Sequence, residues 1–291
     1  MSESQKIKYS YQDCWNYALS LREDIYIQEV KNDIITLCQT APEKFWLEFS
    51  NKSLSAFDYS QICHNLRRHL KNSYPVPYLT NKVSFYGLDF FIEKGVFIPQ
   101  RDTEVLVEKV LELTEKYWGR EENIKVLDIG TGCGNIVISL ANSRPKWSFT
   151  AVDINKKALK TSQLNTTNQQ IKNIKFVWSD LFSNIDKHEK FDIIVANPPY
   201  VNESEYKNLP PEVKEQPKEA LVAEDNGYFF YREIFRQTHN FLVEKFLLAV
   251  EIGYQQKENV IKLIIEYFPQ AKVSIFPDWA GYSRVVAIYQ S

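Results

Sequence analysis

Apolar residues recur at every third or fourth position through the first quarter of the chain, which is the period of an amphipathic helix. Three such stripes consist of Cys14, Ala18, Leu21 and Ile25, of Val30, Ile34 and Leu37, and of Tyr59, Ile62, Leu66 and Leu70. Ser10 precedes the first stripe and is the expected N-cap of its helix. We therefore predict that residues 1–74 form an all-helical bundle domain.

The pattern changes at two prolines, Pro75 and Pro77, because proline interrupts a helix. Residues 83–92 then predict a short β-hairpin, so we expect residues 75–97 to link two domains. A further helix is predicted from Thr103 onward, with Asp102 or Thr103 as its cap.

The second domain, residues 98–291, alternates between apolar runs of strand length and amphipathic helical segments. Strands are predicted at 124–129, 147–153, 174–180, 190–196 and 245–252, and helices at about 134–142, 156–168, 228–242 and 255–268. Such alternation predicts an α/β fold with a doubly wound, mostly parallel sheet and right-handed crossovers.

The end of the chain departs from that alternation, because 271–276 and 284–289 read as two strands with no helix between them. Such a pair must form an antiparallel hairpin at the sheet edge. A mostly parallel sheet with one reversed terminal strand is typical of the Rossmann-like class I S-adenosylmethionine-dependent methyltransferases, which sets the chain apart from plain dinucleotide binders.

Composition indicates an ordinary globular chain, with 44% hydrophobic and 25% charged residues and a net charge of −2. This charge argues against bulk affinity for nucleic acid, and Arg67, Arg68 and Lys71 suit a solvated helix face better than an RNA-binding one. The four cysteines and four histidines show no metal-binding spacing. No signal peptide or membrane span is evident, so we expect a cytoplasmic monomer without metal or membrane contact.

A glycine-rich turn follows the first predicted strand of the second domain, in the order Asp128, Ile129, Gly130, Thr131, Gly132, Cys133, Gly134. Glycines let the backbone approach a ligand closely, although they also serve plain tight turns. The spacing is GxGxG rather than the GxGxxG of dinucleotide binders. Asp128 would repel a phosphate but attract an ammonium group, which favours S-adenosylmethionine over NAD.

Carboxylates also end the next two predicted strands. Asp153 could accept hydrogen bonds from both ribose hydroxyls, and Asp180 from the exocyclic amine of an adenine covered by Leu181 and Phe182. Each aspartate alone could equally be a helix cap or a turn residue. Three carboxylates at three successive strand ends favour a nucleoside site.

The fourth predicted strand stops at Asn197-Pro198-Pro199-Tyr200. Proline has no N–H and a fixed φ, so the pair ends the sheet ladder and makes the turn stiff. The carbonyls of Asn197 and Pro198, with the Asn197 side chain, would form an uncharged cluster of hydrogen-bond acceptors beside an aromatic ring. We expect this cluster to bind a planar NH2-bearing group, either a side-chain amide or the amine of a base; a plain structural turn is the alternative.

With these residues placed, the chain resembles the HemK/PrmC family of N(5)-glutamine methyltransferases, which modify class I peptide chain release factors. The likeness rests on Pro77–Thr80, Phe97–Pro99, Asp102–Glu104, Asp128–Gly134, Asn197–Tyr200, Pro217–Leu221, Glu251–Tyr254 and Arg284–Val286. An N-terminal helical bundle of this size, expected to recognise the substrate, also belongs to that family. Asn-Pro-Pro-Tyr alone is shared with adenine and cytosine amino-methyltransferases.

The resemblance implies S-adenosylmethionine as cofactor and the glutamine of a Gly-Gly-Gln tip as substrate. The residues expected to hold the cofactor are Asp128, Gly130, Thr131, Gly132, Cys133, Gly134, Asp153, Asp180, Leu181 and Asn197. Those expected to hold the glutamine are Asn197, Pro198, Pro199 and Tyr200, of which Asn197, Pro198 and Tyr200 are the expected catalytic residues.

The chain departs from the family pattern at two places. The usual Pro-Arg-Pro-Asp-Thr-Glu reads Pro99-Gln100-Arg101-Asp102-Thr103-Glu104, so the arginine stands one position later. The usual Glu before Pro217 is Gln216. Alternative functions are methylation of a ribosomal protein glutamine or of a nucleic-acid base, and, in a different class, an inactive cofactor-binding scaffold.

Overall fold

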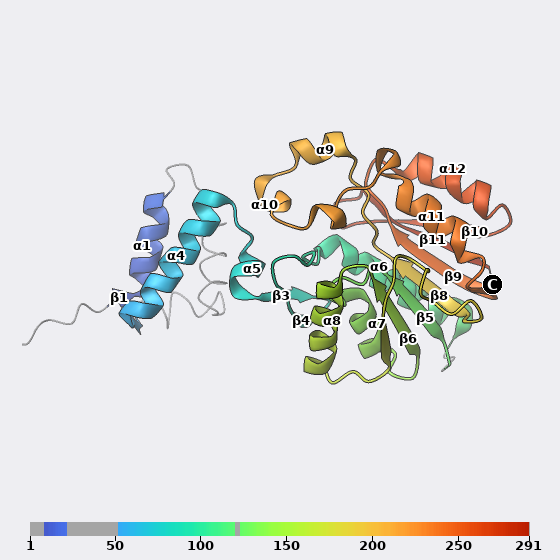
Figure 1. Ribbon diagram of the computed structural model, residues 1–291, viewed down its shortest axis with the longest axis horizontal. Helices are drawn as coiled ribbons and strands as arrows, with labels where there is room; N and C mark the ends of the chain where they lie inside the picture. Colours follow the sequence, from blue (N-terminus) through green and yellow to red (C-terminus); the bar gives the residue numbers. More distant parts are fainter. Residues whose placement is uncertain (1–8, 22–51, 120–122, 291) are drawn as a thin grey trace, which may run out of the picture. The chain divides into compact units, whose positions relative to one another are not determined.

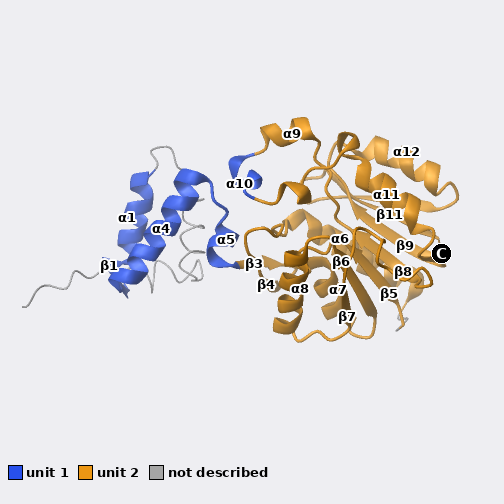
Figure 2. Cartoon of the chain, in the orientation of Figure 1, with its two compact units in different colours: residues 1–81, 210–215 blue, residues 82–209, 216–291 orange. Residues whose placement is uncertain are grey.

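The computed structural model describes residues 9–21, 52–119 and 123–290. The chain divides into two compact units, coloured separately in Figure 2. Unit 1 comprises residues 1–81 with 210–215, and unit 2 comprises residues 82–209 with 216–291. Residues 210–215, which come after the predicted corner Asn197–Tyr200, therefore belong to the first unit.

Unit 1 is built on two amphipathic helices, α1 (Tyr11–Leu21) and α4 (Ala56–Asn72), with the short helices α5 (Val76–Thr80) and α10 (Pro211–Lys214). The Ser10 hydroxyl accepts a hydrogen bond from the Asp13 N–H at 3.3 Å, as expected of an N-cap. The apolar stripes of α1 and α4 meet in a core of Cys14, Trp15, Ala18, Cys63, Leu66, Leu70 and Val76. The stripe from Val30 to Leu37 lies outside the described residues.

The prediction that this segment is wholly helical is wrong at two places. Strands β1 (Tyr9–Ser10) and β2 (Ser53–Leu54) pair antiparallel beside the two helices. Each strand has only two residues, which is too few for a hydrophobic period to appear in the sequence.

Unit 2 begins with the hairpin β3 (Lys82–Phe85) and β4 (Leu88–Phe91). Its main sheet has seven strands in the order β10-β11-β9-β8-β5-β6-β7. Their bounds are β5 Lys125–Ile129, β6 Ser148–Asp153, β7 Ile174–Trp178, β8 Phe191–Ala196, β9 Leu242–Glu251, β10 Lys272–Pro277 and β11 Ser283–Gln290. The strands from β9 through β7 run parallel, and β11 pairs antiparallel with both β9 and β10, which confirms the predicted reversed terminal strand.

The chain leaves β5 toward β6 and β7 on one side and leaves β8 toward β9 on the other, so the strand order reverses between β5 and β8. Because crossovers are right-handed, the two directions place their helices on opposite faces of the sheet (Figure 1). The helices are α6 Glu104–Trp118, α7 Asn135–Ser143, α8 Lys156–Asn168, α11 Phe229–Thr238 and α12 Lys257–Tyr267. Ligands in open α/β sheets bind at such a reversal, beyond the carboxyl ends of the strands.

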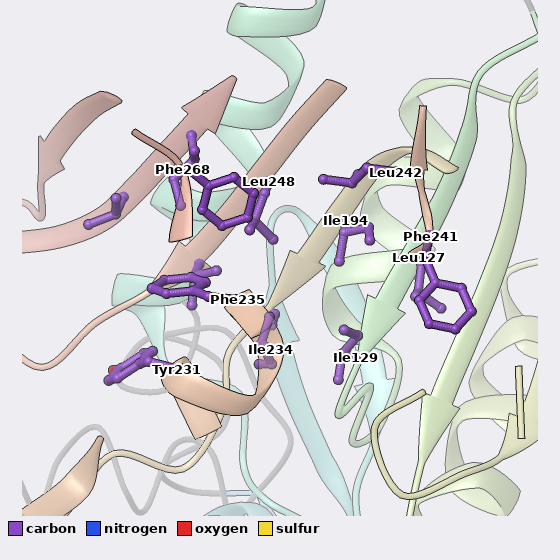
Figure 3. Close-up of a cluster of buried hydrophobic side chains, with 14 of the residues drawn as sticks. Leu127, Ile129, Ile194, Tyr231, Ile234, Phe235, Phe241, Leu242, Leu248 and Phe268 are labelled. Atoms are coloured by element: carbon purple, nitrogen blue, oxygen red, sulfur yellow. The ribbon is translucent and has the colours of Figure 1, made fainter. Parts of the chain in front are cut away.

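One large apolar cluster holds α11 and α12 against the sheet (Figure 3). Tyr231, Ile234 and Phe235 repeat at helical spacing on α11 and are fully buried. They pack with strand residues such as Leu127, Ile194 and Leu248. These three are register partners on neighbouring strands, so their side chains face the same side of the sheet.

The predicted strands and helices of unit 2 all occur, with ends that differ by at most four residues, and α8 has the predicted bounds. The segment 201–226, for which the hydrophobic pattern predicts no element, contains α9 (Glu203–Asn208) and α10, and the single turns η3 (Lys218–Ala220) and η4 (Asp225–Gly227). Asn202 and Glu205 cap α9 reciprocally, so local capping makes a helix where no apolar stripe exists.

Two adjacent isoleucines of α12 provide a test of this packing. Ile264 is fully buried, whereas Ile265 is 63% exposed. Ile264→Ala should lower the free energy of unfolding by about 2–5 kcal/mol, because it leaves a cavity in the core. Ile265→Ala should change it by less than about 1 kcal/mol. Urea unfolding of both variants checks this, and equal losses would contradict the assignment of faces.

Candidate active site

An open cleft lies where the strand order reverses. It is lined by Phe97, Ile129, Gly130, Thr131, Gly132, Asn135, Ile136, Val152, Asp153, Ile154, Asn155, Ala158, Ser179, Asp180, Leu181, Asn197, Pro198, Pro199, Pro217, Glu219, Ala220 and Phe230. The loops after β5, β6, β7 and β8 form one side, and the segment around η3 forms another. The cleft therefore collects residues from seven separate stretches of the chain.

The glycine-rich turn is tied to the end of β6 by backbone hydrogen bonds. The Gly132 N–H donates to Asp153 Oδ2 at 2.8 Å, and the Asn155 N–H donates to Asp153 Oδ1 at 2.7 Å. Gly132 has φ +57°, which few other residues adopt without strain. Burial raises the pKa of Asp153, while these N–H groups favour its charged form. Asp153 is thus held rigidly at the cleft wall.

Asp128 lies beneath the cleft rather than in its lining. It is fully buried, and its Oδ2 accepts a hydrogen bond from the Thr131 hydroxyl at 2.6 Å. Its Oδ1 has no hydrogen-bond partner among the described residues. Burial raises its pKa to about 7. Direct contact between Asp128 and a ligand in the cleft stays a prediction.

The end of β7 contributes Asp180 and Leu181 to the lining, beside Ile154, which follows the neighbouring strand β6. Ile154 is 58% exposed although it is apolar, so a flat apolar ligand could cover it. Phe182 does not join them: it is buried in the core and stacks on Phe241 with ring centroids 4.8 Å apart. The prediction that Phe182 covers an adenine ring is therefore wrong, because its side chain points into the protein.

The Asn-Pro-Pro corner lies beside the glycine turn because Ile129 and Ala196, the last residues of β5 and β8, are register partners. Asn197, Pro198 and Pro199 all line the cleft. The Asn197 side-chain NH2 donates to the Thr103 hydroxyl at 3.0 Å. The predicted cofactor turn and the predicted substrate corner thus face the same space.

Tyr200 lies outside the lining, and burial raises the pKa of its hydroxyl. That hydroxyl is 3.5 Å from Arg284 Nη1, and the Tyr200 carbonyl accepts a hydrogen bond from Gln256 Nε2 at 2.9 Å. Gly227 packs so closely that a Cβ there would stand 2.3 Å from the Tyr200 carbonyl oxygen. The corner is therefore locked from behind; stacking of Tyr200 on a substrate stays a prediction.

Two more predicted residues, Cys133 and Gly134, also lie outside the lining. The Cys133 thiol is buried, and a Cβ at Gly134 would stand 2.8 Å from Ile138 Cδ1. Gly134 thus permits close packing between the turn and α7 rather than approach to a ligand.

The departures at residues 100, 101 and 216 have visible consequences. The buried Gln216 accepts a hydrogen bond from the Ile98 N–H at 3.0 Å, and Gln100 Nε2 donates to the Ile98 carbonyl at 2.8 Å. Both side chains hold the irregular segment that leads to η2 (Arg101–Thr103). Arg101 is exposed, whereas Arg284 makes ion pairs with Asp102 at 3.1 Å and Asp278 at 3.0 Å.

Comparison with known proteins matches residues 88–256, more than half of the chain, to the methyltransferase small domain. A release factor glutamine methyltransferase of Fusobacterium nucleatum is 38% identical over 81% of this chain and 66% of its own length. One of Streptococcus pneumoniae is 36% identical over 78% of this chain and 79% of its own. The chain belongs to the release factor glutamine methyltransferases. It is therefore an S-adenosylmethionine-dependent enzyme.

Solved structures agree on the fold. The hMettl16 catalytic domain in complex with a MAT2A 3'UTR hairpin aligns with TM-score 0.55 and 15% identity, over 87% of this chain and 91% of that one. SMU.776, a putative methyltransferase complexed with SAH, aligns with TM-score 0.51 and 14% identity, over 83% of this chain and 68% of that one. At such identities the likeness concerns the class I methyltransferase fold alone.

The cleft suits the cofactor of this family. Asp153 and Asp180 offer acceptors for hydroxyl and amine groups, and Ile154 and Leu181 offer apolar walls for a planar base. The orphaned Asp128 oxygen beneath the glycine turn suits a nearby cation. Within residues 9–21, 52–119 and 123–290, no helix is both long and apolar enough to cross a membrane.

The raised pKa of Asp128 predicts a pH-dependent stability. Its ordinary pKa is 3.8 and its folded value about 7, so the free energy of unfolding should fall as pH rises from 4 to 7. Asp128→Asn keeps a partner for Thr131 but cannot ionise. Its stability relative to the parent should therefore improve across that window and stay level above it.

Urea unfolding of the cofactor-free protein at pH 5 and pH 8 checks this expectation. Asp180→Asn is the control, because Asp180 is exposed at the mouth of the same cleft. A difference between Asp128→Asn and parent that is the same at both pH values would contradict the prediction.

Proposed function

We propose that this protein transfers a methyl group from S-adenosylmethionine to the side-chain amide nitrogen of a glutamine in a peptide chain release factor. The observation that carries the proposal is the uncharged Asn197-Pro198-Pro199 corner, which opens into the same cleft as the glycine turn and Asp153. Such a corner offers acceptors to an NH2 group without adding charge. The names of the relatives point to the same substrate.

An amide nitrogen is a weak nucleophile because its lone pair is delocalised into the carbonyl. In the proposed mechanism the Asn197 side-chain oxygen and the Pro198 carbonyl accept hydrogen bonds from the two N–H groups of the glutamine amide. These bonds hold the nitrogen in line for attack and stabilise positive charge that develops on it. The two prolines keep both acceptors in place, since their φ angles are fixed.

When bound, S-adenosylmethionine supplies a methyl group whose bond to the sulfonium sulfur breaks as the new bond to nitrogen forms. The methylated amide then loses one proton to water, because a protonated amide is strongly acidic. No side chain of the cleft has to act as a strong base. We assign Asp153 to the ribose hydroxyls, Asp180 and Leu181 to the adenine, and Gly130, Thr131 and Gly132 to the amino-acid end of the cofactor.

The substrate is proposed to be a protein loop, and we infer that unit 1 contributes to its recognition. The net charge of −2 favours a protein over a nucleic acid partner. We expect the enzyme to act as a monomer in the cytoplasm, because translation factors are available there.

The decisive experiment offers release factor, ribosomal protein, RNA and DNA separately with a labelled methyl donor. Label on the release factor, mapped by peptide mass to one glutamine, supports the proposal. Label only on ribosomal protein or nucleic acid would replace it with one of the alternative substrates. Cofactor binding without transfer to any acceptor would support the inactive scaffold.

Two substitutions should separate the roles of the cleft. Asn197→Ala should lower kcat about 100-fold or more while leaving affinity for S-adenosylhomocysteine nearly unchanged, because an acceptor of the substrate is lost. Asp153→Asn should instead weaken S-adenosylhomocysteine binding about tenfold or more. Calorimetry and single-turnover transfer measure the two effects. Near-normal turnover of Asn197→Ala would refute the mechanism.

A further inference from the structure

A buried acid stands directly behind the Asn197 corner and has no part in the mechanism above. Glu251 ends β9, one residue after Val250, which is the register partner of Ala196 on β8. Glu251 therefore lies beside Asn197 at the same edge of the sheet. It is only 2% exposed, and its Oε2 has no hydrogen-bond partner among the described residues. An acid this deep needs an explanation, because burying a charge is costly.

The neighbours of Glu251 connect it to the corner. The Thr103 and Asn197 side chains lie near its carboxylate and lower its pKa, because polar hydrogens close to a carboxylate favour the charged form. The Asn197 NH2 also donates to the Thr103 hydroxyl at 3.0 Å. Thr103 is itself 1% exposed, so this three-residue network is closed to solvent on the protein side.

The network decides which end of the Asn197 amide faces the cleft. A carboxylate can only accept hydrogen bonds, so the Asn197 NH2 must face Glu251. The side-chain oxygen is then turned away from Glu251, and Asn197 lines the cleft. In the opposite orientation the oxygen would meet the carboxylate, and the NH2 would oppose the N–H groups of a substrate amide.

We infer that Glu251, together with Thr103, is a positioning residue that holds the Asn197 amide with its oxygen toward the substrate. This inference rests on the proposed function, because it concerns the acceptor that the mechanism assigns to Asn197. Glu251 touches neither substrate nor cofactor; it acts through the orientation of the side chain in front of it.

Charged groups around Glu251 set how this device responds to pH. Burial is the largest influence and raises the pKa of Glu251 to about 7; Arg284 opposes this rise and Asp102 adds to it. Tyr200 and Asp278 also face this cluster through Arg284, at 3.5 Å and 3.0 Å. A protonated Glu251 can donate to the Asn197 oxygen and so permit the wrong orientation. Turnover should therefore fall as pH drops below about 7.

Matched variants test the network. Glu251→Gln has the same shape, but its amide can donate as well as accept, so it should lower kcat about 10- to 100-fold and abolish the acid limb of the pH profile. Thr103→Val removes only the hydroxyl and should lower kcat similarly. Thr103→Ser restores the hydroxyl and should rescue transfer relative to Thr103→Val. Affinity for S-adenosylhomocysteine should change less than about twofold in all three, because none of these residues lies on the cofactor wall.

A spectroscopic readout keeps this inference separate from the choice of substrate. The side-chain NH2 signal of Asn197, assigned by its loss in Asn197→Ala, should show protection from solvent exchange in the parent and lose it in Glu251→Gln. If the parent methylates an acceptor other than a release factor, the proposed function fails, and the same kinetics are run on that acceptor. Unchanged kcat in Glu251→Gln and Thr103→Val, or an Asn197 signal that neither variant alters, overturns the inference.

Discussion

The parallel pairing of β5 with β8 is the interaction on which the rest of the site depends. Its last register pair, Ile129 and Ala196, places the glycine turn and the proline corner side by side, although they are far apart in sequence. The strand order reverses at this same pair, so no crossover helix covers the space above it. Both strands are buried between two layers of helices, and their main-chain hydrogen bonds are shielded from water. The distance between the glycine turn and the proline corner is therefore set by the backbone rather than by mobile side chains.

Much of the fold of unit 2 follows from the sequence, because buried parallel strands and amphipathic helices leave strong periodic patterns. The segment 156–168 shows this best, since its predicted and observed bounds agree. The predictions fail where local bonds rather than periods make the structure. Strands β1 and β2 are too short to show a period, and α9 depends on a reciprocal cap between Asn202 and Glu205. Strand β9 begins at Leu242, three residues before its predicted start, because the apolar pattern of 228–242 favours a helix up to that residue.

The site divides in the same way. Residues at strand ends, such as Gly132, Asp153 and Asn197, could be predicted because a parallel sheet gathers those ends at one edge. Side-chain direction does not follow from a strand pattern, and so the prediction that Phe182 covers the ligand fails: its side chain packs in the core. Thr103 and Glu251 cannot be predicted as neighbours of Asn197, because these contacts join three distant stretches of the chain. The available signal is the position of Glu251 directly after the apolar run of β9, because an acid at a buried position is rare and usually has a specific partner.

The contact behind Tyr200 also constrains how this protein can change over generations. A Cβ at Gly227 would stand 2.3 Å from the Tyr200 carbonyl, and Gln256 closes the other side. Every single-base change that replaces this glycine introduces at least that extra carbon or ends translation. Any other residue at position 227 would therefore clash with the Tyr200 carbonyl unless the corner had already moved. An exposed residue such as Trp279, by contrast, can vary without disturbing the reacting groups.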